Sequence, residues 1–380
     1  MCRPHSKIKF AAFALALMSL LEFPLHAADS TLESQDRDTH ITGAFQMRSA
    51  LVDENFERSD TVGLGADVAV DHRLMDSLTT RAAIGLNLDT GSTQTTFTDE
   101  YKPIQGILLK DAYLDWNALG ESHLVAGAIN QKWLESPLLV GDLAFPAALA
   151  RIQATVGIFT IQLSAEQAVP TSDTTHSIPR GDEPLPGADF ERATLGINIP
   201  NEFTFKAHVG HYAFYDLPSG VALESRVRGN SVTGVGDQGS EFIYDFNGVE
   251  AGATLAKHFD SRWDARINAS YLTNLRAPLA QSRGMLLSIE ASYQIKPSLI
   301  LTPTATVFRS ESDSTPAYYN TSTFAHNNRQ GFGAGVMLGF PKNNLEIEGS
   351  WVLARVIQVN PFQSDFNGVL LSLKKSYDFF

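Results

Sequence analysis

The chain has 380 residues, of which 43% are hydrophobic, 10% aromatic and 19% charged. Its net charge of -13 disfavours nucleic acid as a partner, because binding phosphates requires a basic face. Aromatic residues spread along the whole chain disfavour disorder, and after the N-terminal segment no run approaches the ~18 apolar residues of a membrane-spanning helix.

Residues 1–27 have the pattern of a secretory signal peptide. Basic residues come first, an apolar run from Phe10 to Leu21 follows, and Leu25-His26-Ala27 then precedes Ala28-Asp29. We therefore expect export across the inner membrane and cleavage after Ala27. A short membrane anchor is the rival interpretation, and it is disfavoured because the apolar run is roughly 12 residues where a span needs ~20. The only cysteine, Cys2, leaves with this segment, so no disulfide framework is expected.

From His40 onward, apolar side chains alternate with small or polar ones in segments of roughly 10 to 14 residues. Leu287, Ile289 and Ala291, for example, alternate with polar neighbours. The pattern predicts about 16 strands, each with one apolar and one polar face. They cover residues 39–53, 61–72, 77–88, 105–117, 121–131, 147–156, 158–168, 188–199, 202–214, 242–256, 262–275, 284–295, 298–311, 328–340, 343–357 and 366–379.

The connections between these strands alternate between short turns and long polar loops. This parity is typical of closed antiparallel transmembrane barrels, which have short turns at one end and long loops at the other. A β-sandwich would have shorter strands and no such parity, and a propeller would show a fixed repeat, which we do not find. We predict one barrel domain over residues 28–380, with a short lead at 28–38 and no separate plug domain.

The third long connection, residues 132–146, is more apolar than a free surface loop. Trp133, Leu138, Leu139, Leu143 and Phe145 are among its side chains. A barrel of ~16 strands is wide enough for water and is commonly narrowed by a loop that folds inward. We expect this loop to fold into the lumen and to place Glu135 and Asp142 opposite lumenal arginines.

The last predicted strand carries a family resemblance. Val369, Leu371, Leu373, Tyr377 and Phe379 alternate, and the chain stops at Phe380. This strand resembles the signal that the barrel-assembly machinery reads in Gram-negative outer-membrane proteins, although the final Phe380 lies one residue beyond the alternation. The resemblance implies assembly into the outer membrane by that machinery.

A second resemblance covers about 40 residues inside the chain. It consists of Lys110-Asp111-Ala112-Tyr113-Leu114-Asp115-Trp116, then Gly127, and then Pro137 with Gly141-Asp142-Leu143. This arrangement resembles the porin families of proteobacteria. The resemblance implies a passive channel and does not supply a solute.

Alternation also assigns charged side chains to the lumen, although it puts the neighbours Lys110 and Asp111 on opposite faces. The candidate bases are Arg48, Arg81, Arg192, Arg266 and Lys374, and the candidate acids are Asp67, Asp71, Asp111, Asp115, Glu290, Glu346 and Glu348. Facing rows of opposite charge set selectivity in a pore, whereas the plainer interpretation is a solvated wall without a selective role. The acids Asp111, Asp115, Glu346 and Glu348 come in pairs along the chain, which favours a weak preference for cations.

An aromatic girdle is expected at the membrane interface of such a barrel. The residues that fit it, near short-turn ends, are Trp116, Trp263, Tyr377 and Phe379.

Other chemistry is not indicated. No nucleotide fingerprint or Gly-x-Ser-x-Gly elbow occurs, and the acids Asp237, Glu241 and Asp245 lack the spacing of a calcium loop. A barrel hydrolase would need a serine beside His208 or His211. We therefore expect no catalytic residue, no metal and no cofactor.

The sequence thus predicts an outer-membrane porin that forms a water-filled channel for small hydrophilic solutes or ions. A substrate-specific uptake barrel, for example for a siderophore, is the main alternative, and an outer-membrane hydrolase is less favoured. The expected partners are outer-membrane lipid and the assembly machinery. A monomer and a homotrimer are both compatible with the sequence.

Overall fold

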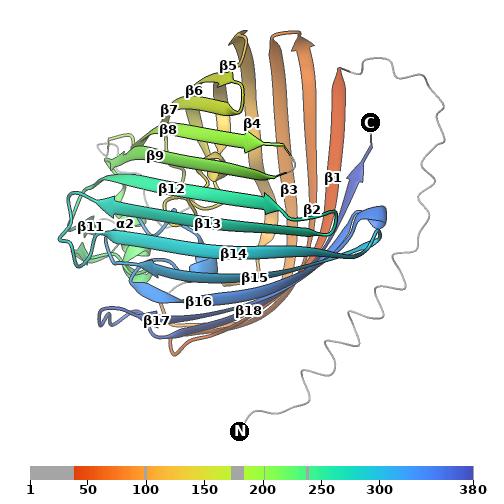
Figure 1. Cartoon of the computed structure of the whole chain (residues 1–380). Helices are drawn as coiled ribbons and strands as arrows, with labels where there is room; N and C mark the ends of the chain where they lie inside the picture. Colours follow the sequence, from red (N-terminus) through yellow and green to blue (C-terminus); the bar gives the residue numbers. More distant parts are fainter. Residues whose placement is uncertain (1–37, 98–100, 173–183, 201, 237–238, 380) are drawn as a thin grey trace. The chain divides into compact units, whose positions relative to one another are not determined.

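The computed structural model describes residues 38–97, 101–172, 184–200, 202–236 and 239–379. The expected signal peptide, nearly all of the lead before the barrel, Asp237 and Phe380 lie outside these residues. Sixteen strands form one closed antiparallel barrel, in which β1 pairs with β18 to complete the ring (Figure 1). The predicted fold class is therefore confirmed.

The barrel strands follow the predicted segments closely, and β2 and β3 extend further than expected. They are β1 (Thr39–Asp53), β2 (Glu57–Met75), β3 (Leu78–Thr95), β4 (Gln105–Leu119), β5 (Ser122–Asn130), β6 (Ala144–Val156), β7 (Phe159–Ala168), β8 (Gly187–Ile199), β9 (Phe203–Tyr215), β12 (Phe246–His258), β13 (Trp263–Asn274), β14 (Arg283–Lys296), β15 (Leu299–Ser310), β16 (Arg329–Phe340), β17 (Leu345–Val356) and β18 (Phe366–Asp378).

The period of two decides which face of each strand points outward. On β14, the exposed Met285, Leu287 and Ile289 share one face, whereas Leu286 on the other face is buried in the interior. Apolar side chains on the outer face need no water, and closure of the ring pairs every strand edge. The outer wall is accordingly apolar along most strands.

A β-bulge corrects one expectation from strict alternation. The register between β3 and β4 shifts between Ala83 and Ile84, which lie opposite Asp111 and Leu109. The extra residue in β4 lets Lys110 and Asp111 both reach lumenal partners, Asp67 at 2.7 Å and Arg81 at 3.5 Å. These two neighbours were predicted to lie on opposite faces.

Short turns join the strands at one end of the barrel, which we call the inner end. Gly120 and Gly157 each occupy such a turn with φ at +62°, a conformation that favours glycine. The connections at the opposite, outer end are named in chain order. They are L1 (54–56), L2 (96–104), L3 (131–143), L4 (169–186), L5 (216–245), L6 (275–282), L7 (311–328) and L8 (357–365).

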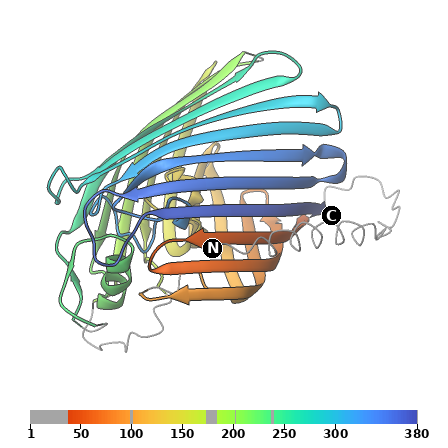
Figure 2. The ribbon, with the colours of Figure 1, turned by 90° about the horizontal axis from the view of Figure 1, so that it is seen from below.

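L5 contains regular structure where the sequence predicts only a polar loop. Helix α2 (Ser219–Val227) begins after Pro218, and β10 (Val232–Thr233) pairs with β11 (Glu241–Phe242). Figure 2 shows α2 at the end where the long loops gather. Shorter 3-10 turns are η1 (Gln131–Leu134), η2 (Ser322–Phe324) and η3 (Pro341–Asn343). Among the described residues, no helix is long and apolar enough to cross a membrane.

Candidate functional site

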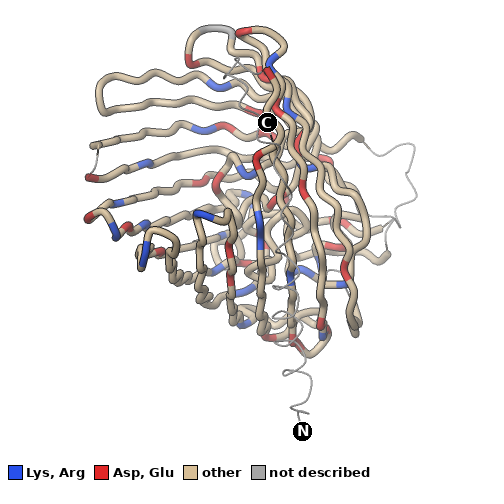
Figure 3. The backbone as a smooth tube through the Cα atoms, turned by 90° about the vertical axis from the view of Figure 1, so that its right-hand side faces the viewer, with Lys and Arg blue, Asp and Glu red and all other residues tan. Residues whose placement is uncertain are grey.

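The candidate site is the lumen, where acidic and basic side chains are interleaved. Figure 3 shows charged residues along the strands as well as at their ends. On β1 and β3, Arg48 donates to both carboxylate oxygens of Asp89, at 3.0 and 2.9 Å. Next to them, Arg81 lies between two acids, 2.9 Å from Asp71 and 3.5 Å from Asp111. The structure thus brings the predicted lumenal groups Arg81, Asp71 and Asp111 together as ion pairs. It gives Arg48 a partner, Asp89, that was not among the predicted lumenal acids.

The neighbouring part of the wall continues this pattern on β4 and β5. Asp115 lies 2.8 Å from the Nδ1 atom of His123 on the next strand. Asp111 also accepts a hydrogen bond from the backbone N–H of Asn130 at 3.0 Å. Both acids that the sequence pairs along β4 therefore have partners on the wall.

Across the lumen, the charges on β8 and β12 are buried. Arg192 donates to Glu250, and both side chains are at most 4% exposed. A buried charge is tolerated when it is paired, so this contact fixes β8, β9 and β12 relative to one another.

The remaining candidates lie opposite one another in the strand register. Arg266 on β13 faces Glu290 on β14, and Glu346 on β17 faces Lys374 on β18. Glu348 faces Ser372. Glu346 and Glu348 therefore share one basic neighbour on β18.

L3 lies against the inner wall through its apolar side chains. Leu134, Leu138, Leu139 and Val140 are at most 3% exposed. They pack in one cluster with lumen-facing aromatic and aliphatic side chains of the wall. These wall residues are Phe145, Ala168, Ala188, Phe190, Tyr212, Phe214, Phe246, Leu272 and Leu286.

The polar side chains of L3 meet lysines where arginines were expected. Glu135 pairs with Lys206 of β9 at 2.7 Å, and Asp142 pairs with Lys132 of the same loop at 2.6 Å. Burial opposes ionisation of Asp142, but hydrogen bonds from Lys132 and Asn130 outweigh it and lower the pKa of this carboxyl. Arginine instead contacts Trp133, whose ring lies 5.7 Å from the guanidinium carbon of Arg192.

L7 spans the lumen at its outer end, which the sequence did not indicate. The ring of Tyr319 packs between Phe214 of β9 and Phe145 of β6, with centroids at 5.8 and 5.5 Å. Six residues later, Ala325 is buried in a cluster that includes Val52 of β1. In the closed ring β1 and β9 are eight strands apart out of sixteen, so they lie on opposite walls.

Side-chain amides hold L7 to L5. Asn230 of L5 donates to the carbonyl oxygens of Ser312 and Thr315, at 2.6 and 2.9 Å. Asn327 donates to the same two carbonyl oxygens from within L7, at 3.1 and 2.6 Å. These contacts satisfy buried backbone groups that no strand pairs.

A carboxyl group, that of Asp313, also contacts L5 at this interface. It accepts hydrogen bonds from the backbone N–H and the hydroxyl of Ser231, at 2.8 and 2.7 Å. Burial raises the pKa of the Asp313 carboxyl even though hydrogen bonds from Ser231 and Ser312 oppose that change.

L7 is also bonded to L3. The hydroxyl of Thr315 donates to the carbonyl of Leu138 at 3.0 Å, and the N–H of Gly141 donates to the carbonyl of Tyr319 at 2.8 Å. L3, the described part of L5, and L7 therefore form one packed body, which we call the loop cap. Its apolar parts pack on opposite walls of the barrel.

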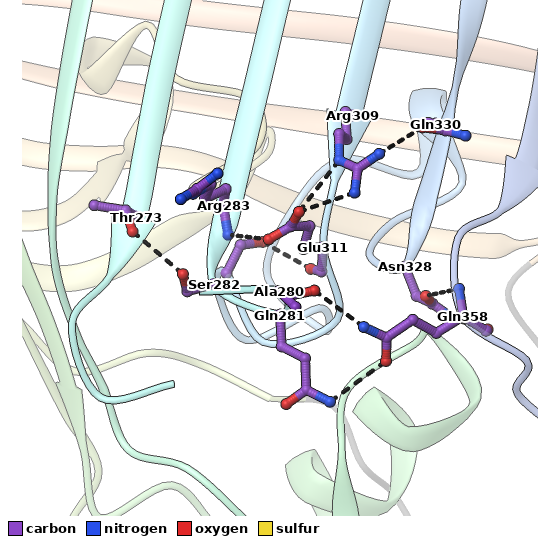
Figure 4. Close-up of polar contacts among 11 residues, drawn as sticks. Thr273, Ala280, Gln281, Ser282, Arg283, Arg309, Glu311, Asn328, Gln330 and Gln358 are labelled. Atoms are coloured by element: carbon purple, nitrogen blue, oxygen red, sulfur yellow. Dashed lines mark hydrogen bonds and ion pairs between the residues drawn. The ribbon is translucent and has the colours of Figure 1, made fainter. Parts of the chain in front are cut away.

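Loops L6 and L8 are hydrogen-bonded to each other at the outer end of the barrel (Figure 4). Gln358 of L8 donates to the carbonyl of Ala280 at 3.0 Å and accepts from Gln281 at 3.4 Å. Nearby, Arg309 holds the carboxylate of Glu311 at 3.0 Å. Loops L6 and L8 are thus held against each other by hydrogen bonds.

The predicted girdle residues point away from the lumen near the inner end. Trp116 and Trp263 are about half exposed, and Trp263 packs on Tyr293 with ring centroids 4.5 Å apart. The rings of Tyr377 and Phe379 are stacked 5.9 Å apart. Among the described residues no group of three or more His, Cys, Asp or Glu is arranged to hold a metal ion.

Comparison with solved structures identifies the architecture. OprB of Pseudomonas putida superposes with a TM-score of 0.56 at 10% identity, over 90% of this chain and 94% of that chain. OmpF of Salmonella typhi gives 0.54 at 10% identity, over 89% and 97%. The chain has the fold of the outer-membrane porins. The outer-membrane channel DcaP of Acinetobacter baumannii gives 0.51 at 12% identity, over 89% and 97%.

At these identities the likeness concerns the fold. No family model and no curated protein matches the sequence. The charges of this porin-type lumen and the loop cap are therefore the observations that bear on what the protein does.

Proposed function

We propose that the protein is a passive outer-membrane channel for small hydrophilic solutes or ions, and not an enzyme. The observation that carries this proposal is the contrast between an apolar outer wall and an interior with charged side chains on strands that include β1 to β4, β8, β9, β12 to β14, β17 and β18. An interior of this kind holds water and conducts charged or polar solutes.

A weak preference for cations follows because several lumenal acids have only one basic side chain beside them. Asp71 and Asp111 lie beside a single guanidinium, that of Arg81. Asp115 is paired with the imidazole of His123 and not with a lysine or an arginine. Glu346 and Glu348 have Lys374 as their basic neighbour. A surplus of negative charge in a low-dielectric wall concentrates cations.

The position of the loop cap is evidence that the channel is narrow at its outer end. L7 reaches both walls at the outer end, so solutes must pass beside it. This observation also supports the second candidate function, a substrate-specific uptake barrel, because a restricted entrance favours a solute that fits it. A barrel hydrolase has less support, since His211 contacts Asn247 and Glu191 and neither is a nucleophile of the expected type.

Conductance in planar bilayers separates the candidates. The purified protein should give ohmic single-channel steps, with a reversal potential under a KCl gradient that favours K⁺. Absence of conductance together with tight, saturable binding of one solute would instead support a specific uptake barrel. Hydrolysis of a lipid or ester by the purified barrel would overturn the assignment as a non-enzyme.

The location follows the same proposal. Export by the segment 1–27, recognition of β18 by the barrel-assembly machinery and residence among outer-membrane lipids are all expected of such a channel. Cell fractionation of a Gram-negative host with and without residues 379–380 tests this, and the truncated chain should be depleted from the outer membrane.

A further inference from the structure

A cavity of about 370 Å³ opens into the lumen at the inner end of the barrel. Its lining comes from β8, β9, β12, β13 and β14, which Figure 1 shows side by side. Two residues of this lining, Arg266 and Glu290, share their strand faces with Leu272 and Leu286, which are buried in the interior. The cavity therefore belongs to the lumenal side of the wall, and we call it the inner pocket.

One row of lumenal positions shapes the inner pocket. In order of strand pairing, this row is Asn198, Thr204, Ala256, Arg266 and Glu290. The small side chain of Ala256 leaves a gap between polar groups on either side. From Asn198 to Arg266 the wall is three strand spacings wide, or roughly 14 Å.

The rows next to this one carry charges that are already paired. Toward the outer end, Lys206 lies 2.7 Å from Glu135 of L3. Toward the inner end, the Nδ1 atom of His258 contacts the carboxylate of Asp264. The charged groups that remain open to a solute are those of the row between them.

Arg266 and Glu290 are lumenal charges without a side-chain partner. Among the described residues neither makes an ion pair or a side-chain hydrogen bond, although the two positions are register neighbours. The side-chain oxygen of Asn198 accepts a hydrogen bond from Thr204 at 3.3 Å, so its N–H groups remain available as donors. The pocket thus offers a guanidinium and a carboxylate on one side of Ala256, and an amide on the other.

We propose that the inner pocket binds a small zwitterionic solute, namely an α-amino acid with an uncharged polar side chain. This inference rests on the proposed function of a channel for hydrophilic solutes. Arg266 receives the carboxylate, because a guanidinium donates two parallel hydrogen bonds to such a group. Glu290 receives the ammonium group, and the side chain of the solute extends over Ala256 toward Asn198.

A solute with a single charge fits the pocket less well. An anion beside Arg266 meets the repulsion of Glu290, and a cation beside Glu290 meets the repulsion of Arg266. The Cβ atoms of directly paired residues on neighbouring strands lie about 5 Å apart. An α-amino acid carries both of its charges on one carbon atom, so it can contact both side chains at once.

Current recordings with three matched solutes test the proposal. In planar bilayers at low ionic strength, where charges are screened least, L-glutamine should lower the conductance of the wild-type protein in a saturable way. Glutaminamide lacks the carboxylate, and glutaric acid monoamide lacks the ammonium group. Each should need about tenfold higher concentrations for the same effect, because each loses a charge-assisted hydrogen bond. Equal potency of all three solutes overturns the proposal.

Variants locate the effect in the inner pocket. Arg266→Gln and Glu290→Gln should each raise the half-saturating concentration of glutamine by about tenfold. Ala256→Leu fills the gap without changing a charge and should weaken the effect as well. The matched controls are Arg262→Gln and Glu121→Gln, which change exposed residues of inner-end turns outside the pocket lining and should leave it unchanged. An undiminished effect in Arg266→Gln, or equal losses in the controls, would contradict the assigned site.

Conductance without solute tests the channel separately. Heat-modifiable migration on gels shows first that each variant barrel is folded. A conducting wild type on which glutamine has no saturable effect removes the inner pocket and leaves the channel. If the wild type does not conduct, equilibrium dialysis of labelled glutamine against the folded barrel in detergent decides the matter. Retention that is lost in Arg266→Gln then supports the pocket without the channel, and absence of retention overturns both.

Discussion

The rings of Tyr319 and Phe214 stack with their planes 4° apart, although one belongs to loop L7 and the other to wall strand β9. This contact anchors L7 to one side of the lumen, and Ala325 anchors it to the other. If L7 limits the width of the passage through the barrel, weakening either of these two contacts should widen the passage.

Replacing Tyr319 with alanine should therefore raise single-channel conductance and its fluctuation. Truncating a fully buried aromatic side chain costs about 3–5 kcal/mol, which here weakens the local closed arrangement of L7. Bilayer recordings measure the conductance, and hydrogen exchange measures the protection of residues 311–328. The matched control is Tyr319→Phe, because the buried hydroxyl has no hydrogen-bond partner among the described residues. Unchanged conductance in Tyr319→Ala would show that L7 does not limit the passage.

The attachment of L7 to L5 should weaken as pH rises. The pKa of Asp313 is raised by burial, so the packed state favours the protonated carboxyl. Its contribution is complete below the ordinary carboxyl pKa of about 4 and is lost as pH rises through the raised value. A spin label at Ser322→Cys should be less mobile at pH 4 than at pH 7. Asp313→Asn should flatten this dependence, and an equally steep profile in that variant would assign it to another group.

Ion selectivity should respond most to the glutamates of β17. The double change Glu346→Gln and Glu348→Gln should lower the K⁺ over Cl⁻ permeability ratio by roughly twofold, because it removes two carboxylates beside one lysine. Reversal potentials under a KCl gradient give the ratio. The comparison variant is Asp111→Asn with Asp115→Asn, whose carboxylates have closer partners and should matter less. An anion-selective wild type would contradict the preference.

The buried pair of Arg192 and Glu250 should govern barrel stability more than conduction. Arg192→Met should lower the free energy of unfolding by about 3–5 kcal/mol, because Glu250 would stay buried without its partner. Adding Glu250→Gln should recover much of this loss. Urea titration of the folded barrel, followed by tryptophan fluorescence, measures both. If the double variant is no more stable than Arg192→Met, the loss comes from packing of the arginine stem.

The sequence predicted the strands and the closed ring because side chains along each wall strand point alternately toward lipid and toward the lumen. Apolar and polar residues therefore alternate with a period of two. It also singled out L3, since Leu138 and Leu139 are too apolar for a solvated loop. L7 gave no comparable signal. Its burial depends on Asn230 and Asn327 bonding to buried carbonyls, and Ser, Thr and Asn at those positions have the composition of an exposed loop. Only Pro316-Ala317-Tyr318-Tyr319 and Phe324 hinted at an apolar environment.

Strict alternation also failed at β4, for a local reason. One extra residue between paired positions reverses the face of every side chain beyond it. No residue type marks the bulge at Lys110 and Asp111, so it could be located only from the register of β3 with β4.

The seam between β1 and β18 implies an order of assembly. These strands come from opposite ends of the barrel domain, and their pairing completes the ring. The loop cap lies inside that ring and bonds to walls on both sides, so it must be enclosed as the ring forms. We therefore expect L3, L5 and L7 to gather against β6 to β14 first, and the seam to close around them last.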